Sequence, residues 1–214
     1  MNKKLSIKRM TFIAIFSALS VIFYTIIPKI SLPIFPPFLE LNFSMIPIVI
    51  CSFMLGPIDG VICVLVRFFV KLPMSGTMCV GETADLLIGL PVAFFSGFMY
   101  NKTNIKYKEL FAFIGSLLIW VIMSVIANAF INIPFYSWML REVGGLDTIV
   151  AASSDAFKLI SSGKIIVNKE NFMFYYLLVA VVPFNLLLST VVLLITWPIH
   201  KRIKVLYTKI GKTE

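Results

Sequence analysis

The stretch FMFYYLLVAVVPFNLLLSTVVLLITWPI, residues 172–199, holds no charged side chain over 28 positions. About 20 predominantly apolar residues are enough for a helix to cross the hydrocarbon core of a bilayer. A second uncharged run, LFAFIGSLLIWVIMSVIANAFINI, occupies residues 110–133. The rest of the chain has the same character, since its 214 residues are 59% hydrophobic and only 14% charged. This composition excludes a soluble enzyme, a disordered tail and a disulfide scaffold, and it predicts an all-α integral membrane protein.

Apolar runs predict six transmembrane helices within a single transmembrane domain, residues 1–214. Their expected bounds are 10–27, 43–55, 57–72, 81–100, 110–133 and 172–199. The second and third runs are short for spans, and only the turn signal Gly56-Pro57 separates them. Four prolines keep the 28–41 segment from being helical throughout. The first run has no small-residue cleavage site after it, so we interpret it as an uncleaved span and not as a signal peptide.

Basic residues indicate how the chain is oriented. The formal net charge is +9, and most of the excess lies at the two ends of the chain and between the fourth and fifth runs. The basic residues in these places are Lys3, Lys4, Lys8, Arg9, Lys102, Lys106, Lys108, Lys201, Arg202, Lys204, Lys209 and Lys212. Because cytoplasmic loops are enriched in Lys and Arg, we predict a multi-pass protein of the cell membrane with both termini inside (N-in/C-in). No nucleic-acid partner is needed to explain the charge, although contact with anionic lipid remains a second possible role.

The segment between the fifth and sixth runs, residues 134–171, is long for a loop and lies outside in this topology. We expect its residues 151–160 to form a short helix against the outer face of the protein. The sequence leaves open whether this outer segment is a lid or an exposed connection.

Patterns that carry chemistry are missing from the sequence. It has no Walker A loop, no HExxH, no nucleophile elbow and no Cys/His cluster. Cys51, Cys63 and Cys79 have no CxxC spacing and are interpreted as small buried hydrophobes. The single histidine, His200, follows the last apolar run and is expected at the surface. We therefore predict no catalytic residue, no metal site and no cofactor, and we expect another subunit to supply the energy for any transport.

Ionisable side chains inside membrane spans are costly, which makes them the first candidates for function. Arg67 lies in the third run, while Glu82 and Asp85 share one helix face at the start of the fourth. We expect these groups either to join short helices as an ion pair or to bind a polar ligand that enters from outside. Asn128 and Asn185 pose the same choice between interhelical hydrogen bonding and lining a polar pocket.

Two further features point to contacts with other molecules. Phe38 lies beside Pro37 at a predicted outer end, and we expect it either to stack on a flat ligand or to anchor the chain at the membrane interface. Ala14 and Ala18 form a small-xxx-small pair in the first span. Small faces of this kind let another helix approach closely.

Five short motifs in a fixed order resemble a known family. They are PFLELNFS at residues 37–44, GPIDG at 56–60, GETAD at 81–85, N-x5-P-F-Y at 128–136 and PFN at 183–185. Together they are similar to the membrane-embedded S components of energy-coupling factor (ECF) vitamin transporters, most like the riboflavin-specific RibU type. The resemblance implies a six-helix subunit that captures a vitamin and has no ATPase of its own. It also implies that Ala14 and Ala18 contact a transmembrane coupling subunit, which works with two ABC ATPase subunits.

The same resemblance implies roles for residues around the ligand. Leu41, Asn128 and Asn185 are expected to approach the flavin, Glu82 matches a glutamate of the family's fourth helix, and the proline-rich first loop gates the pocket. The riboflavin type has a ligand-binding lysine where Leu188 stands here, so pantothenate or another vitamin-like metabolite is the alternative ligand. An intramembrane enzyme that uses the two acidic residues of the fourth run is the alternative from a different class.

Overall fold

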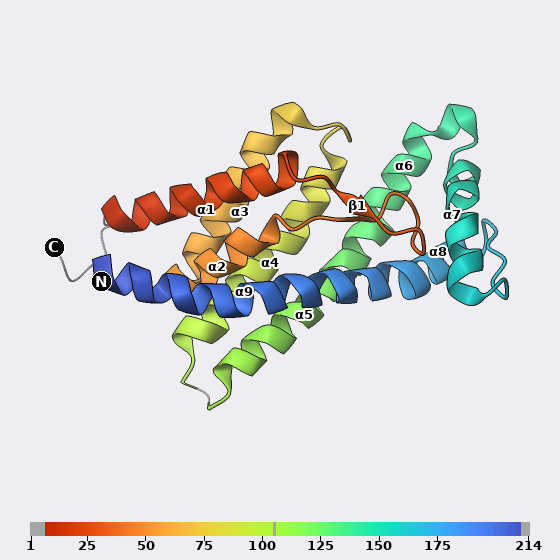
Figure 1. Ribbon diagram of the computed structural model, residues 1–214. Helices are drawn as coiled ribbons and strands as arrows, with labels where there is room; N and C mark the ends of the chain where they lie inside the picture. Colours follow the sequence, from red (N-terminus) through yellow and green to blue (C-terminus); the bar gives the residue numbers. More distant parts are fainter. Residues whose placement is uncertain (1–6, 105, 211–214) are drawn as a thin grey trace.

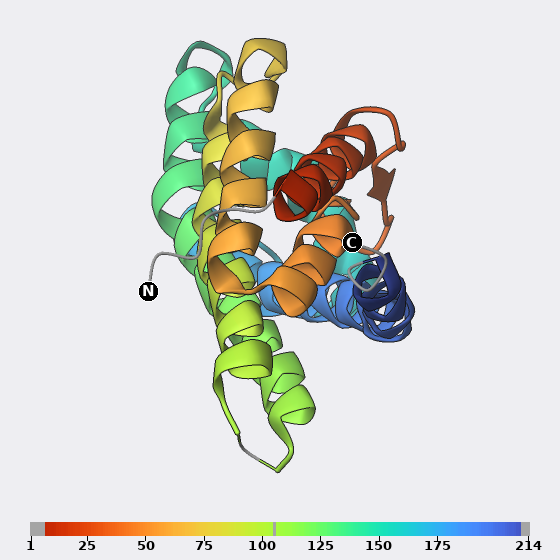
Figure 2. The same ribbon diagram turned by 90° about the vertical axis from the view of Figure 1, so that its left-hand side faces the viewer.

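Helices pack along one long axis in the computed structural model, which describes residues 7–104 and 106–210 (Figure 1). Helix α1 (Ile7–Thr25) begins and helix α9 (Val182–Ile210) ends at the same end of the molecule, whereas α7 (Leu146–Ser161) stands across the opposite end (Figure 1). Helices α4 (Val80–Lys102) and α5 (Lys108–Ala127) extend past the others toward the turn that joins them (Figure 2). Lys3, Lys4 and Lys212 of the basic pattern lie outside the described residues.

The elements of the described chain are mostly α-helices. In chain order they are α1 (Ile7–Thr25), β1 (Ile30–Ser31), β2 (Glu40–Leu41), α2 (Met45–Leu55), α3 (Pro57–Lys71), η1 (Leu72–Met74), α4 (Val80–Lys102), α5 (Lys108–Ala127), η2 (Asn128–Asn132), α6 (Ile133–Met139), η3 (Arg141–Val143), α7 (Leu146–Ser161), α8 (Phe172–Tyr175), η4 (Tyr176–Val181) and α9 (Val182–Ile210). Segments η1 and η3 are 3₁₀-helical, while η2 and η4 are π-helical. Within the described residues, β structure is limited to the two-residue antiparallel ladder between β1 and β2, so the predicted all-α class is confirmed.

Among the described residues, four helical stretches are long and apolar enough to cross a membrane: Ile7–Thr25, Val80–Lys102, Lys108–Met139 and Phe172–Ile203. Helices α2 and α3 have only 11 and 15 residues, which makes each shorter than a hydrocarbon core of about 30 Å at about 1.5 Å per residue. Every residue of α2 except Leu55 is buried. The long helices therefore surround α2 and shield its backbone from lipid.

Two helices continue beyond the ends that the sequence predicts. The fifth was expected to stop at Ile133, but it passes through Pro134 and ends at Met139. The sixth was expected to stop at Ile199, but it ends at Ile210 and contains Pro183. In both cases a π-helical segment lies just before the proline. Proline has no N–H to donate to the carbonyl at i−4, and the wider π-helical turn lets the helix continue without that hydrogen bond. Helix α7 (Leu146–Ser161) is likewise longer than the predicted 151–160.

Glycines allow close packing around the turn between α2 and α3. Gly56 has φ of +120°, which favours glycine, and Pro57 begins α3 with the ring that suits a first helical position. Helix α4 crosses this turn at Gly97, where an added Cβ would come within 2.7 Å of the Pro57 backbone. A larger residue at Gly97 would therefore push α4 away from α2 and α3.

The proline-rich segment 28–41 is not helical, as predicted, and we call it the strap. It doubles back on itself through the β1–β2 ladder. Lys29 and Glu40 form an ion pair at 3.3 Å next to this ladder. From the middle of the strap, the buried ring of Phe35 packs edge-on against Phe184 of α9, with ring centroids 5.3 Å apart. The strap is thus held against the helices by its own aromatic side chain.

Two ion pairs tie helices together at the end where α1 begins. Arg9 of α1 contacts the Asp59 carboxylate with Nη2 at 2.7 Å and with Nε at 2.8 Å. Asp59 lies in the first turn of α3, and its side chain is 1% exposed. Lys201 of α9 pairs with Glu109 of α5 at 3.0 Å. These pairs bring together the helix ends that carry most of the basic residues.

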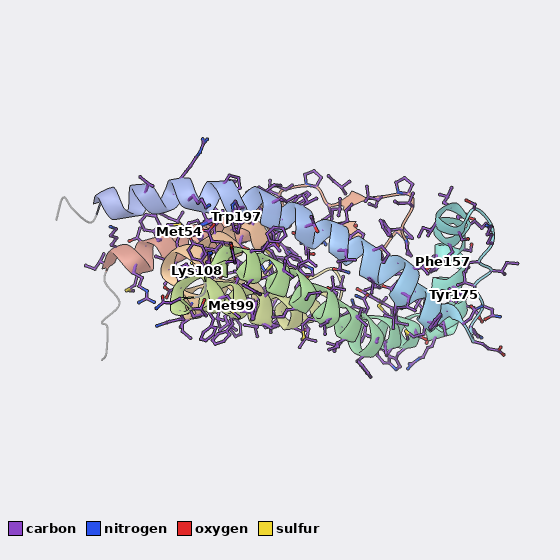
Figure 3. The ribbon with its side chains drawn as sticks, turned by 90° about the horizontal axis from the view of Figure 1, so that it is seen from below. Met54, Met99, Lys108, Phe157, Tyr175 and Trp197 are labelled. Atoms are coloured by element: carbon purple, nitrogen blue, oxygen red, sulfur yellow. The ribbon has the colours of Figure 1, made fainter. Side chains whose placement is uncertain are left out.

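His200 is buried at this same end, so the expectation of a surface histidine is wrong. Its ring packs on Phe53 at 4.9 Å, and its Nε2 lies 3.2 Å from the Tyr100 hydroxyl. The expectation failed because α9 does not end at the last apolar run but continues beside α2 and α4. Trp197, one turn earlier on α9, marks this end in Figure 3, far from Phe157 at the other.

Helix α7 packs across the opposite end through one apolar face. Phe157 is fully buried and meets Phe172 of α8 edge-on, with ring centroids 6.4 Å apart. Asp147 at the start of α7 pairs with Lys169 at 2.6 Å. Residues 146–161, between the two longest apolar runs, therefore form an ordered helix docked on the bundle.

We predict that Asp59→Ala lowers the thermal unfolding midpoint of the purified protein in detergent. Removing the carboxylate takes away the acceptor of two Arg9 contacts, at a cost of about 1–3 kcal/mol. The matched control is Asp155→Ala, which removes an exposed ion pair with Lys158 and should change stability by less than about 0.5 kcal/mol. Equal midpoints for the two variants would contradict the stabilising role of the Arg9–Asp59 pair.

Candidate functional site

A cavity of about 710 Å³ lies between the strap and the helices. Its walls come from the end of α1, the strap, α3, α4, the continuous helix α5–η2–α6, and the continuous helix η4–α9. Pockets that bind small molecules and cofactors are typically about 300–1,000 Å³ in volume. The cavity is therefore large enough to enclose such a ligand.

The structure brings five of the six predicted ligand residues to this cavity. They are Phe38, Glu82, Asp85, Asn128 and Asn185. Leu41 does not line it, because its side chain packs against the hydrophobic core, while its neighbours Glu40 and Asn42 line the cavity. Contact of these residues with a ligand stays a prediction.

Asn185 of α9 connects two helices at the cavity wall. Its Oδ1 accepts hydrogen bonds from Trp120 Nε1 at 3.2 Å and from Ser124 Oγ at 2.9 Å, both on α5. Its Nδ2 donates to the Val181 carbonyl one turn earlier at 2.9 Å. The amide oxygen is thus fully used, and the amide nitrogen keeps one N–H.

Asn128 forms a similar junction between the two π-helical segments. Its Nδ2 donates to the Ser124 carbonyl at 2.8 Å. Its Oδ1 accepts from Asn132 Nδ2 at 3.2 Å and from the Tyr176 hydroxyl at 2.6 Å. Asn128 begins η2 and Tyr176 begins η4, and π-helical turns often occur at functional sites because they redirect side chains.

Both alternatives for these amides hold at once, because each joins helices and also lines the cavity. The existing hydrogen bonds of these side chains decide which donors and acceptors are left for a ligand. Oδ1 of Asn128 and Oδ1 of Asn185 already accept two bonds each, whereas each side-chain NH₂ group has one N–H left to donate. The two amides can therefore donate to acceptor atoms of a ligand but have little capacity to accept from it.

Glu82 is buried at the start of α4 and is held by the preceding loop. Its Oε2 accepts hydrogen bonds from Ser75 Oγ at 2.6 Å and from Thr77 Oγ1 at 3.0 Å. Among the ion pairs of residues 7–104 and 106–210, none joins Arg67 to Glu82 or Asp85 within 4.0 Å. The interhelical ion pair that we considered from the sequence is therefore not formed as a direct contact.

Arg67 instead bonds to the start of α2. Its Nη1 donates to Ser44 Oγ at 2.7 Å, and Ser20 Oγ of α1 donates to the Ser44 carbonyl at 2.7 Å. Ser44 and Arg67 both line the cavity. Ser44, at the start of α2, thus connects α1, α2 and α3 beside the cavity.

Sequence reasoning missed several polar residues of the cavity. Trp120 lines the cavity, and Ser124 bonds to Asn185 in its wall. Both precede Asn128 at intervals of four on one helix face, and this spacing was a usable signal. Tyr24 and Lys71 also line the cavity, from the ends of α1 and α3. No spacing in the sequence relates these two residues, because only the packing of α1 against α3 brings them together.

Ala14 and Ala18 lie on a different surface. They are exposed on α1 and line an apolar groove of about 660 Å³, whose other side is formed by Ile62, Val66 and Val70 of α3. Small side chains on α1 leave room in this groove for another helix.

The fold and the cavity define an integral membrane protein that encloses a small polar site among apolar helices. The sequence model of the family described as ECF transporter, substrate-specific component, matches residues 8–200. The chain belongs to this family. It is therefore a transporter subunit of the cell membrane and not an enzyme, and membership implies association with an ECF module.

Relatives with names support this assignment. The chain is 27% identical over 157 residues to riboflavin transporter RibU of Staphylococcus aureus (strain TCH60), covering 72% of this chain and 82% of the relative. It is 23% identical over 164 residues to riboflavin transporter FmnP of Bacillus subtilis (strain 168), with coverages of 73% and 85%. It is 27% identical over 186 residues to riboflavin transporter RibU of Lactococcus lactis subsp. cremoris (strain NZ9000), with coverages of 84% and 85%.

One solved structure, described as the S component of a bacterial ECF transporter, resembles the fold with a TM-score of 0.63. The two share 24% sequence identity, and the match covers 92% of this chain and 95% of the other. The architecture described above is therefore one that a solved S component also has.

We predict that Asn185→Leu destabilises the protein and that Trp120→Phe partly restores it. Leucine leaves the Trp120 and Ser124 donors without their acceptor in a low-dielectric wall, which costs about 1–3 kcal/mol. Phenylalanine removes one of these donors, so the double variant should lose less than the sum of the single variants, by about 0.5–3 kcal/mol. Thermal unfolding of all four proteins in detergent measures this coupling, and simple additivity would contradict it.

Proposed function

We propose that the chain captures riboflavin at the outer side of the membrane, as the S component of an ECF-type transporter. The observation that carries this proposal is a cavity with two free amide N–H donors set among aromatic rings. We call this part of the cavity the amide wall, and it consists of Trp120, Asn128, Tyr176 and Asn185. The names of the relatives from Staphylococcus, Bacillus and Lactococcus point to the same ligand.

The chemistry of the amide wall suits a flavin. The flavin heterocycle is flat and presents carbonyl oxygens and ring nitrogens that accept hydrogen bonds. The remaining donors of Asn128 and Asn185 match such acceptors, while the rings of Phe38 and Tyr176, 5.6 Å apart, offer flat apolar surface. Leu188 lines the cavity as an apolar side chain and offers no hydrogen bond. The two amides therefore carry more of the polar recognition than they would if a lysine stood at this position. Pantothenate or another vitamin-like metabolite is the second candidate.

We infer that the single domain of residues 1–214 crosses the membrane six times, with both termini inside. The proposed spans are those expected from the sequence, 10–27, 43–55, 57–72, 81–100, 110–133 and 172–199. The short second and third spans are stabilised by burial within the bundle, where the long helices replace lipid around them. The joining of the basic helix ends by the Arg9–Asp59 and Lys201–Glu109 pairs supports a common inner side.

In this proposal the chain binds its ligand while the ECF module supplies the energy. The module consists of a transmembrane coupling subunit and two ABC ATPase subunits, and the coupling subunit docks in the groove beside Ala14 and Ala18. Riboflavin enters from outside, the strap closes over the cavity, and ATP hydrolysis in the module drives reorientation of the subunit and release inside. The lipid bilayer surrounds the remaining apolar surface.

We predict that protein purified from cells supplied with riboflavin is yellow and shows flavin absorption. Asn128→Leu and Asn185→Leu should each weaken riboflavin binding at least about tenfold, or roughly 1.4 kcal/mol, because each removes one donor from the amide wall. Fluorescence quenching on ligand-free, folded protein measures the affinity, with the exposed Asn104→Leu as matched control. A colourless protein that binds pantothenate would favour the second candidate instead.

We also predict that Ala14→Trp or Ala18→Trp abolishes riboflavin uptake but leaves ligand binding unchanged. The indole fills the groove that a helix of the coupling subunit would occupy, and neither alanine lines the cavity. Uptake is measured in cells that contain the complete module, and binding is measured on the purified subunit. The exposed Leu118→Trp on α5 serves as control. Normal uptake by both alanine variants would mean that this groove faces only lipid.

A further inference from the structure

The turn between α4 and α5 carries basic side chains that neither the cavity nor the groove uses. Lys102 ends α4, Lys106 lies in the turn, and Lys108 begins α5. We call these three residues the basic tip. The two helices carry it out beyond the rest of the bundle (Figure 2), and Lys108 lies at the same end of the molecule as Trp197 (Figure 3). The basic tip is thus a surface separate from both sites described above.

Carboxylates do not neutralise the basic tip. In the described part of the chain, none of its three lysines forms an ion pair within 4.0 Å. The nearest acidic residue in the sequence, Glu109, pairs instead with Lys201 of α9 at 3.0 Å. At the start of α1, by contrast, Arg9 is neutralised by Asp59. The basic tip therefore presents uncompensated positive charge to its surroundings.

Tyrosine rings lie beside these ammonium groups. Lys108 Nζ is 5.4 Å from the centroid of the Tyr100 ring, and Lys106 Nζ is 5.4 Å from that of the Tyr107 ring. Tyr107 is 59% exposed. Tyrosine is enriched at membrane–water interfaces, where its ring contacts apolar chains and its hydroxyl reaches the headgroups. Together the rings and the lysines indicate a surface at the depth of the lipid headgroups.

An exposed apolar stripe begins next to the basic tip and continues along α5. It consists of Phe111, Ile114, Leu118 and Ile122, which are between 47% and 56% exposed. Intervals of three and four residues place them on one helix face, and Lys108 precedes Phe111 by three residues on the same face. A soluble anion would contact the lysines and leave this stripe bare. A phospholipid contacts both, because its phosphate is joined to acyl chains.

We propose that the basic tip and the apolar stripe of α5 together bind an anionic phospholipid. The lysines donate hydrogen bonds to the headgroup phosphate, and the acyl chains lie along the stripe. A zwitterionic lipid binds more weakly, because its choline group brings a positive charge near the same lysines. In the proposed topology the basic tip faces the inner leaflet, whose anionic lipids attract basic segments. The proposal goes beyond vitamin capture and does not depend on which vitamin the cavity holds.

Native mass spectrometry of the purified full-length protein tests the proposal by titration with dioleoyl phosphatidylglycerol or dioleoyl phosphatidylcholine. The native chain should bind the phosphatidylglycerol at least about tenfold more tightly. The triple variant Lys102→Gln/Lys106→Gln/Lys108→Gln should reduce this preference to less than about threefold, whereas the charge-keeping variant Lys102→Arg/Lys106→Arg/Lys108→Arg should retain it. The matched control neutralises three exposed lysines at the other end, Lys158→Gln/Lys164→Gln/Lys169→Gln, and should also retain it.

Two further measurements make the outcome decisive. Lys106→Gln alone changes one exposed turn residue and should lower the preference about threefold, so the test does not depend on folding of the triple variant. Glycerol 3-phosphate carries the phosphate without acyl chains and should not displace the lipid at equal concentration; displacement would mean a simple anion site and would overturn the proposal. Equal binding of the two lipids by the native chain, or an unchanged preference in the glutamine variants, would overturn it as well.

Discussion

A polar group inside a bilayer needs a partner within the protein, because no water is present to solvate it. The arrangement of this chain follows from that constraint. Asn185 is satisfied by Trp120 across two helices, and Arg67 bonds to Ser44 where three helices meet. Several polar residues of the helices, Arg67, Glu82, Asp85, Asn128 and Asn185, converge on one cavity. Hydrogen-bond donors and acceptors that have no partner within the protein are the ones that can bind a ligand.

Irregular backbone occurs where this convergence requires it. Regular α-helices would present Asn128 and Tyr176 with a fixed spacing of about 3.6 residues per turn. The π-helical segments η2 and η4 interrupt that spacing, and each begins at one of these two residues, whose side chains form a 2.6 Å hydrogen bond. Each of these segments is followed by a proline that does not end the helix. The same local feature therefore tolerates the proline and forms part of the cavity wall.

The fold class could be read from the sequence because apolar composition and long uncharged runs decide whether a chain enters a membrane. The candidate ligand residues could also be found from the sequence, since a carboxylate or amide within an apolar run stands out. The contacts that each side chain makes could not be predicted, because nothing in the local sequence places Lys71 beside Tyr24 or turns Leu41 away from the cavity. The burial of His200 was missed for the same reason, because it depends on how far α9 continues beside its neighbours. Such contacts between distant segments are decided by packing.

Two faces of helix α1 belong to different sites. Its exposed face, with Ala14 and Ala18, forms one side of the apolar groove, and its buried face presents Ser20 and Tyr24 to the cavity wall. A rigid helix cannot shift at one face and stay still at the other. If a docked partner moves α1 and so alters ligand affinity, thermodynamic linkage requires the ligand to alter affinity for the partner by the same factor. The ligand-bound and ligand-free forms of the protein would then compete with different affinities for a limited amount of partner. Ligand binding would thus determine which copies of the protein are bound to the partner.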